Sequence, residues 1–465
     1  MSIAQERIDT LSGELIGLSD RIWGYAETSL KEFLSADDSA AFLESHGFRI
    51  EKNIAGIETA FTATWGSGEP KIGFLAEYDA LPGLSNEVKP VKDAGEEHGA
   101  GHGCGHNLLG VACAAAVLGL KAEMEAKNIP GTIIYFGCPA EENYSAKVPM
   151  AAAGAFAGLS AAFAFHPGSS NGIALNSSVA NNSYFFTFKG KTAHAGGDPH
   201  NGRSALDAVE LMNVGANYLR EHIISDARMH YIITEGGKAP NIVPERAQVW
   251  YFIRAPKVGQ LAEIVARLKK VAGGAAMMTE TEVEYFCESG VYNYLPNEVL
   301  ANTLYEAMKT VQPIEWSSEE MAFATEMVSE IPEAQKLISA EREQGEIDPS
   351  LPLASQINPP SGKGKVMTGS TDVSDVSWQV PTIMFSTACS PWAANGHSWM
   401  VTASSGHSIG HKGMLFAGKA MAEATLMLLA DPALLVAAKE EFSKASAGTE
   451  YKAFGDVPLP KFTRT

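Results

Sequence analysis

One short glycine-rich segment holds the densest group of side chains that could do chemistry. Residues 97–107 contain three histidines and one cysteine: His98, His102, Cys104 and His106. Imidazole nitrogen and thiolate sulfur are natural ligands for zinc and similar ions, and glycines let the backbone crowd around a small ion. The segment therefore predicts part of a metal site. The alternative is a flexible turn that precedes a helix.

Two pairs of carboxylates follow short apolar runs that predict buried strands. Glu77 and Asp79 follow the first run, and Glu141 and Glu142 follow the second. In open α/β sheets, ligands gather at the C-terminal ends of strands, so both pairs could belong to one site. Adjacent carboxylates can divide the work, because one can bind a metal ion while the other acts as general base toward water. Solvated acids in surface turns are the alternative in each case.

Isolated histidines add candidates elsewhere in the chain. His166 follows a third apolar run, and His397 lies in a later turn. A lone histidine is more often structural than catalytic. His407 and His411 lie near His397 and compete with it for any ligand role close to the C-terminus, so the residues alone leave this choice open.

A further group lies in the middle of the chain, at His194, Asn241 and Arg254. An arginine side chain binds carboxylates through two parallel hydrogen bonds, which would suit an anionic substrate. The alternative is that these three are ordinary strand-end and turn residues.

The elements that must position these side chains alternate between strand and helix patterns in the N-terminal part. Strands alternating with helices predict an α/β fold with a mostly parallel sheet and helices on both faces. Apolar runs and helical periodicity carry the prediction. The predicted strands are 71–76, 132–136 and 161–165, and the predicted helices are 3–23, 36–46 and 108–127.

The pattern changes near residue 181. A β-α-β-β-α-β order follows, which is typical of a small ferredoxin-like α+β domain. Its strands are predicted at 183–188, 230–234, 247–253 and 283–289, and its helices at 202–222 and 260–271. The domain is expected to be an insertion, because a strand pattern resumes at 381–386 and a long helix pattern follows at 413–429.

The composition narrows the classes of partner. The chain has 465 residues and a net charge of −19, which argues against nucleic-acid or anionic-membrane partners because phosphate binding needs a basic face. Its five cysteines are too sparse for a disulfide framework. The N-terminus lacks an apolar signal core, and the apolar stretch 108–120 is too short to span a bilayer. These observations predict a cytoplasmic protein that acts on a small molecule.

Seven motifs, taken in order, resemble those of a known enzyme family. The chain is similar to the dinuclear-metal family of aminoacylases, glutamate carboxypeptidases and acetylornithine deacetylases. Within it, the chain resembles the amidohydrolase branch that contains aminobenzoyl-glutamate hydrolase and the hippurate or auxin-conjugate hydrolases. The motifs lie at residues 77–83, 102–107, 138–142, 166–167, 192–195, 241–244 and 369–378.

The resemblance implies a role for each candidate residue. Two divalent ions, zinc or manganese, would be held by five ligands. Glu141 would be the general base, Asp79 would orient a ligand histidine, and His194 would reach the active site of a partner protomer. Asn241 and Arg254 would bind the substrate. The implied metal ligands are Cys104, His106, Glu142, His166 and His397.

The resemblance also implies an activity and an assembly. The expected reaction is hydrolysis of the amide bond of an N-acyl or N-aroyl amino acid, with p-aminobenzoyl-glutamate as the leading substrate. Residues 1–180 and 298–465 would form the catalytic metal-binding domain, and residues 181–297 an inserted lid that also forms a homodimer. The alternatives are a dipeptidase of broader specificity and a chain that needs a homologous partner chain for activity.

Three positions depart from the family pattern or leave a choice. Glu77 stands where other branches have a ligand histidine, so it is either a third carboxylate ligand or a bystander. Asn107 stands where the amidohydrolase branch usually has aspartate. Gly-His-Ser occurs at both His397 and His407. We favour His397 because it lies 16 residues before Gly413, which is expected to open the final helix.

Overall fold

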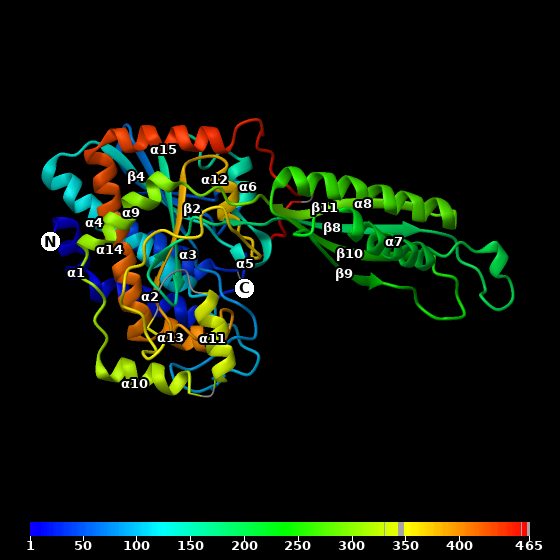
Figure 1. Ribbon diagram of the computed structural model, residues 1–465, viewed down its shortest axis with the longest axis horizontal. Helices are drawn as coiled ribbons and strands as arrows, with labels where there is room; N and C mark the ends of the chain where they lie inside the picture. The colour runs from blue at the N-terminus through cyan, green and yellow to red at the C-terminus, as the bar shows by residue number, and fades with distance from the viewer. Residues whose placement is uncertain (330, 343–347, 457, 463–465) are drawn as a thin grey trace.

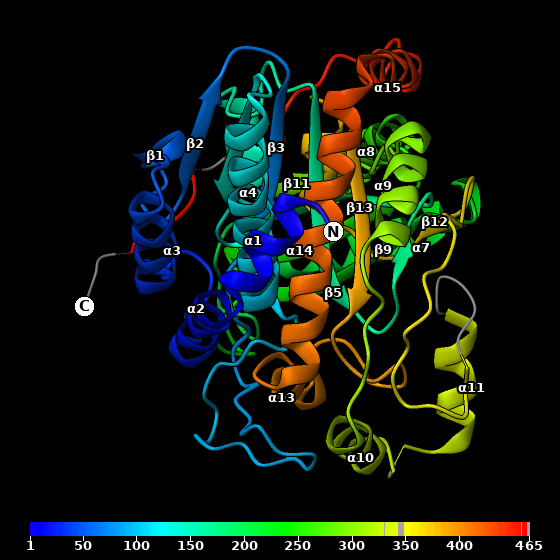
Figure 2. The same ribbon diagram turned by 90° about the vertical axis from the view of Figure 1, so that its left-hand side faces the viewer.

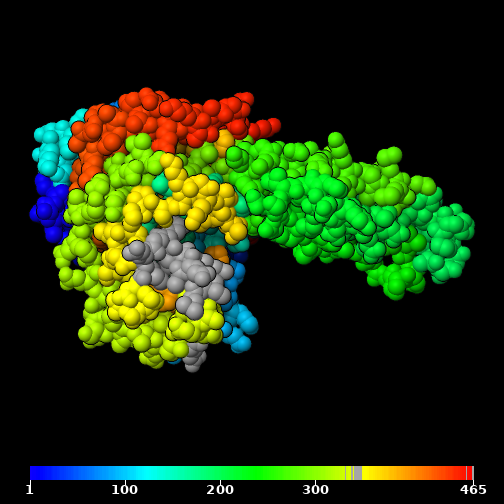
Figure 3. Space-filling model, in the orientation of Figure 1, coloured from blue at the N-terminus to red at the C-terminus, as the bar shows by residue number. Residues whose placement is uncertain are grey.

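The computed structural model describes residues 1–329, 331–342, 348–456 and 458–462. The chain forms a rounded body and an arm that projects from it (Figure 1). The space-filling view shows the arm, coloured green, standing clear of the body along most of its length (Figure 3). Each part is built on its own main β-sheet.

The body contains a seven-stranded mixed sheet. In spatial order its strands are β1 (Arg49–Lys52), β2 (Phe61–Ser67), β4 (Gly131–Gly137), β3 (Lys71–Ala76), β5 (Ala161–Gly168), β13 (Thr382–Ala388) and β6 (Gly172–Ile173). Strands β4, β3, β5 and β13 are parallel, whereas β1, β2 and β6 run antiparallel to their neighbours. The predicted parallel arrangement is thus correct for the centre, and the margins make the sheet mixed.

The marginal antiparallel strands were not predicted from the sequence. β1 and β6 are only four and two residues long, and β2 mixes buried with half-exposed positions. A short strand without a continuous apolar run has little sequence signal, because its conformation depends on the strand beside it.

Helices cover both faces of the sheet, as predicted. The helices of the body are α1 (Ile3–Thr10), α2 (Ser12–Tyr25), α3 (Phe33–Ser45), α4 (His106–Lys127), α5 (Glu141–Tyr144), α6 (Lys147–Ala152), α9 (Glu298–Thr310), α10 (Ser318–Met327), α11 (Glu333–Arg342), α12 (Val373–Ser377), α13 (Trp399–Ser405), α14 (Ser408–Ala430) and α15 (Pro432–Ala445). α4 and α14 pack together on one face with α1 and α9 against them (Figure 2). Along β3, Phe74 joins this core, whereas Leu75 joins the core under α6 and α12, because successive strand side chains point to opposite faces.

Two predicted helices differ from the observed ones. The helix expected over residues 3–23 is two helices, because Leu11 leaves helical geometry with a ψ of 2° while its side chain stays in the core. The expectation that Gly413 opens the final helix is wrong, since α14 begins at Ser408 and α15 follows it. Gly413 instead marks a close approach: a Cβ there would lie 2.3 Å from the carbonyl oxygen of Ala388 at the end of β13.

α4 and α14 are long and apolar enough to cross a membrane, judged by length and composition alone. Their apolar windows are 89% and 61% buried inside the body. They are therefore placed as the core helices of a folded protein are.

The arm is a four-stranded antiparallel sheet with two long helices. In spatial order its strands are β11 (Glu282–Val291), β8 (Ala180–Lys189), β10 (Arg246–Ala255) and β9 (Arg228–Glu235). α7 (Ala205–Leu219) follows β8, and α8 (Val258–Thr279) follows β10, which confirms the predicted β-α-β-β-α-β order. Asn181 pairs with Arg254 at the end next to the body, and Lys189 pairs with Arg246 at the far end. Two short parallel strands, β7 (Ser177–Ser178) and β12 (Val366–Met367), lie where the arm meets the body.

Candidate metal centre

The first group of candidate ligands joins the start of α4 to the end of β5. Cys104, His106 and His166 present ligand atoms that all lie within 4.8 Å of one another. The Cys104 Sγ is 3.3 Å from the His166 Nε2. Gly105 permits this turn, because its φ is +79° and a Cβ there would lie 3.0 Å from the Cβ of Pro167.

A second group shares Cys104 with the first. Glu142, in α5 just after β4, and His397, in the loop after β13, complete it, again with ligand atoms within 4.8 Å. The His397 Nε2 lies 3.6 Å from the Glu142 Oε2. The His397 backbone N–H donates to the Gly103 carbonyl oxygen at 3.0 Å, which ties the two loops together. The two groups together contain all five expected ligands.

The other C-terminal histidines have different contacts. The His407 Nδ1 accepts from the backbone N–H of Ile409 and caps α14, and its ring stacks on Phe323 with centroids 4.1 Å apart. The His411 Nε2 lies 2.9 Å from the Asp20 carboxylate. The structure thus brings His397 to the candidate ligands, although the helix argument used to favour it fails.

Asp79 holds the His106 ring in place. The Asp79 Oδ1 lies 2.9 Å from the His106 Nδ1, and its Oδ2 accepts hydrogen bonds from the Ser29 hydroxyl and the Glu142 N–H. Although burial opposes ionisation, these hydrogen bonds and the His106 charge hold the pKa of Asp79 below its usual value. A carboxylate on one imidazole nitrogen directs the other nitrogen toward the site.

Two buried atoms of the site lack a hydrogen-bond partner among the described residues. They are the His106 Nε2 and the Glu142 Oε1. The His106 Nε2 lies 3.2 Å from the Glu77 Oε2 without forming a hydrogen bond to it. A buried polar atom left unpaired costs about 1–3 kcal/mol. With sulfur, nitrogen and carboxylate donors converging here, both orphaned atoms fit the role of ligands to a divalent ion.

Glu141 lies beside these ligands but faces different neighbours. Its carboxylate forms a third close group with Glu77 and His106, and it lines the large cavity described below. Burial raises the pKa of Glu141 well above its usual value, and the charges of Glu77 and Asp372 raise it further. A carboxylate with a raised pKa suits the work of a general base near neutral pH.

The sequence analysis missed a buried cation next to Glu77. The Lys147 side chain is fully buried, and its Nζ lies 2.5 Å from the Glu77 Oε1 and 2.7 Å from the Asp372 Oδ1. Burial alone would lower the pKa of Lys147, but the two carboxylates hold it well above its usual value. Glu77 and Asp372 lie in the quoted motifs, whereas a lone lysine after Ser-Ala carries no such signal.

The remaining polar residues of the glycine-rich segment have structural contacts. His98 is 91% exposed. The His102 Nε2 lies 3.0 Å from the Ile22 carbonyl oxygen, and burial lowers the pKa of His102 to about 4. The Asn107 side-chain amide donates to the Ser19 hydroxyl and to the Ser405 carbonyl oxygen. An asparagine here therefore links α4 to α2 and α13, which an aspartate without a proton could not do.

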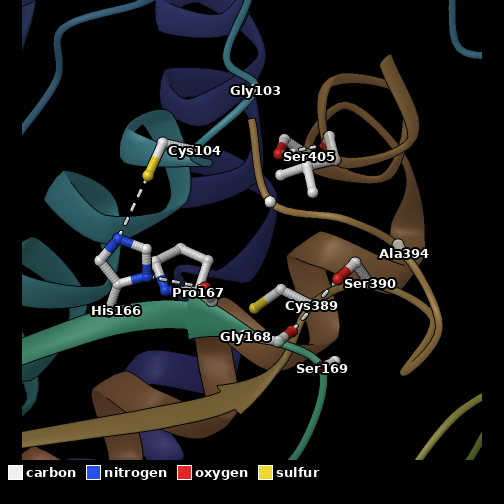
Figure 4. A pocket seen from close by; sticks show the side chains of 12 residues that line it. Gly103, Cys104, His166, Pro167, Gly168, Ser169, Cys389, Ser390, Ala394 and Ser405 are labelled. Atoms are coloured by element: carbon white, nitrogen blue, oxygen red, sulfur yellow. Dashed lines mark hydrogen bonds between the residues drawn. The ribbon is translucent and has the colours of Figure 1, made fainter. Parts of the chain in front are cut away.

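A cavity of about 720 Å³ opens beside the metal centre, where the body meets the arm. Glu141, Cys104 and His397 line it from the body, and Arg254 lines it from the arm. The Arg254 guanidinium contacts Thr368 and Ser370 weakly, both at 3.5 Å. Within the described ranges, no carboxylate forms an ion pair with it. A second, smaller recess shares Cys104 and His166 with this cavity (Figure 4).

His194 and Asn241 lie at the far end of the arm. His194 follows the last residue of β8, Lys189, while Asn181 near the start of β8 lines the cavity. Eight residues of strand span about 26 Å. His194 pairs with Ile242 through a β-bridge, which places it beside Asn241, and both side chains are exposed. The structure therefore does not bring these two residues to the metal ligands of their own chain.

Comparison with known proteins decides the family. A family model of the M20 type, described as a peptidase dimerisation domain, matches residues 180–277. One of the two kinds of chain of the p-aminobenzoyl-glutamate hydrolase of Escherichia coli (strain K12) is 40% identical over 456 residues, covering 96% of this chain and 94% of its own. This chain belongs to the M20 peptidase family. It is a hydrolase that acts on amide bonds, as the family's members are.

Other M20 proteins share the same architecture. The Xaa-Arg dipeptidase of Mus musculus is 30% identical, covering 94% of this chain and 91% of its own. A dinuclear metal-binding M20 peptidase from Bacillus subtilis has a TM-score of 0.60 at 16% identity, covering 91% of this chain and 99% of its own. An aminobenzoyl-glutamate utilization protein from Klebsiella pneumoniae has a TM-score of 0.57 at 17% identity, covering 88% and 97%. The two structures show the shared fold.

Proposed function

We propose that this chain catalyses the metal-dependent hydrolysis of N-acyl or N-aroyl amino acids. The leading substrate is p-aminobenzoyl-glutamate, which would give p-aminobenzoate and glutamate. One observation supports this most strongly: two ligand groups share Cys104, next to the buried Glu141, in the wall of a cavity that also presents Arg254. The 40% identical relative carries the name of the same reaction.

Two divalent ions would occupy the two ligand groups. Cys104, His106 and His166 would hold one, and Cys104, Glu142 and His397 the other. Thiolate and imidazole suit zinc, and carboxylate also admits manganese. Such ions lower the pKa of a coordinated water toward neutrality and polarise the amide carbonyl.

Glu141 would move the protons of the reaction. It accepts a proton from the attacking water and then donates it to the leaving amine. Its burial raises its pKa, so the proton stays at the site between the two steps. Asp79 would keep the His106 ring oriented throughout, through the 2.9 Å contact to its Nδ1.

Arg254 would hold the free carboxylate of the amino acid. It lies in the cavity wall without an acidic partner in the described parts of the chain. His194 and Asn241 would come from a second copy of the chain, because the arm keeps them about 26 Å from their own centre. There His194 would stabilise the oxyanion, and Asn241 would contact the substrate carbonyl. The enzyme would thus work as a homodimer joined through residues 181–297, with the catalytic residues in 1–180 and 298–465.

The second candidate function is that of a dipeptidase, favoured by the 30% identical Xaa-Arg dipeptidase. In a third arrangement, a homologous chain completes the enzyme. The name of the 40% identical relative favours it, because that name describes one component of a hydrolase. All five cysteines are free thiols, which supports work in the reducing cytoplasm.

The test is a product-release assay on metal-stripped protein reloaded with Zn²⁺ or Mn²⁺. The stripped protein should be inactive, and one of the ions should restore hydrolysis of p-aminobenzoyl-glutamate. Full turnover by stripped protein would show the metal assignment to be wrong. A preference for Xaa-Arg peptides would favour the dipeptidase, and activity only after a homologous chain is added would favour the two-chain enzyme.

A further inference from the structure

A small recess lies on the other side of the metal ligands from Arg254. Its volume is about 140 Å³, and Cys104 and His166 form one of its walls. Ser390 and Ala394, from the loop after β13, lie across from them (Figure 4). Gly396 belongs to the lining of both the recess and the large cavity, so the two spaces meet at the metal centre.

This placement determines which half of the substrate each space can take. If Arg254 holds the carboxylate and the amide carbonyl sits at Cys104 and His166, the acyl group must point away from Arg254. The recess is the space that adjoins those two ligands on that side. We propose that the recess is the acyl subsite and that it takes an uncharged group no larger than a single aromatic ring. This inference rests on the proposed function.

The volume of the recess sets the upper size. An engineered apolar cavity of about 150 Å³ binds one benzene molecule. The recess, at about 140 Å³, has room for one ring of that size and for little more. A benzoyl group therefore fits, and a two-ring acyl group does not.

The chemistry of the lining sets the charge. Apart from the ligands Cys104 and His166, the described lining residues are neutral, and none is Asp, Glu, Lys or Arg. The α-ammonium group of a dipeptide would find no carboxylate there, and burying it unpaired is costly. Ser390 and Ser405 place hydroxyl oxygens in the lining, and a hydroxyl can still accept a hydrogen bond when it donates one. A neutral amino group on the ring would thus have an acceptor.

The experiment compares hydrolysis of N-benzoyl-glutamate and N-acetyl-glutamate by the metal-loaded enzyme. Ala394→Leu adds three carbons to the recess, and it should lower the benzoyl-to-acetyl ratio of kcat/KM by about tenfold or more. Gly369→Val is the matched control, because it adds three carbons to the large cavity, where a Cβ meets nothing within 4 Å. It should leave that ratio unchanged. An unchanged ratio in Ala394→Leu would overturn the subsite.

A second variant keeps the test decisive if Ala394→Leu does not fold. Ala394→Gly enlarges the recess, so the ratio of N-(2-naphthoyl)-glutamate to N-benzoyl-glutamate hydrolysis should rise. An unchanged ratio here would also count against the recess as the acyl subsite.

A matched pair of substrates tests the charge. N-propanoyl-glutamate and Ala-Glu differ only in the α-ammonium group, and the propanoyl amide should be cleaved about tenfold faster or more. Equal or faster cleavage of Ala-Glu would overturn the neutral subsite. If wild-type enzyme cleaves none of these amides, the proposed function itself fails. If it cleaves them while the Ala394 variants leave both ratios unchanged, only the subsite fails.

Discussion

Two regions of this protein carry histidines expected to act on substrate, and they differ in nearly every physical respect. At the metal centre, His106 is fully buried and fixed by Asp79 at 2.9 Å. At the far end of the arm, His194 is exposed, and the described contacts of its ring are local, with its Nδ1 accepting from the N–H groups of Gly196 and Gly197. The metal centre is assembled from distant segments of one chain, whereas the end of the arm is built from neighbouring turns.

The contrast teaches where each region obtains its order. Burial makes the hydrogen bonds and charges of the metal centre strong, because water does not screen them. The His194 region is held by short-range contacts and has no cavity of its own in the described structure. It becomes part of a site only against another surface, so its contribution should depend on assembly.

The largest effect is expected at Glu141. Glu141→Gln removes the general base and should lower kcat by about 10²–10⁴-fold, while metal content stays at the wild-type level. Glu142→Gln is the matched control at the next residue, and it should lower metal content. Steady-state kinetics and elemental analysis measure the two effects. Near-normal turnover in Glu141→Gln would show that another group takes the proton.

Substitution at the far end of the arm should have the next largest effect. His194→Ala should lower kcat by about 10²–10³-fold, the usual loss when one oxyanion donor is removed. Mixing it with Glu141→Gln protein should restore about a quarter of the sites, because a mixed two-fold dimer has one site with both residues intact. Protomers would be exchanged and then assayed. Absence of recovery in confirmed mixed dimers would contradict action between chains.

Two Lys–Glu pairs of equal length measure what burial contributes to stability. Lys147 lies 2.5 Å from Glu77 in the body, and Lys189 lies 2.5 Å from Glu284 on the arm. Lys147→Met should lower the free energy of unfolding by about 3–5 kcal/mol, because it leaves buried carboxylates unpaired. Lys189→Met should cost about 0–1 kcal/mol, since that pair is exposed. Denaturant unfolding of both variants gives the comparison, and equal losses would refute it.

The smallest effect concerns pH at the junction between the regions. Asp375 accepts hydrogen bonds from the Tyr292 N–H and the Tyr451 hydroxyl, and burial raises its pKa to about 8. The folded state therefore keeps a proton that the unfolded state has lost, so this contribution to stability falls as pH rises from about 4 to about 8. Asp375→Asn should flatten that part of the profile of Tm against pH. A slope equal to the wild-type slope would contradict the raised pKa.

The positions of the main elements could be predicted because their signals are local. The run 71–76 predicted β3 with its observed bounds, and the order of patterns after residue 181 predicted the arm. Strand-end reasoning also placed Glu77, Asp79, Glu141 and Glu142 together, since parallel strands end at one edge of the sheet. By contrast, β1 and β6 carry almost no pattern, and the start of α14 was misplaced because Gly413 is explained by packing.

The sequence by itself determined the types of ligand, the order of the strands that carry them and the presence of an inserted α+β unit. These follow from side-chain chemistry and from periodicity within single segments. Only the tertiary structure decided that His397 reaches Glu142, that Lys147 lies between Glu77 and Asp372, and that His194 stands far from its own metal centre. Such facts depend on how segments up to hundreds of residues apart pack in space. No local pattern records that packing, because the contacts it creates join residues with no fixed spacing along the chain.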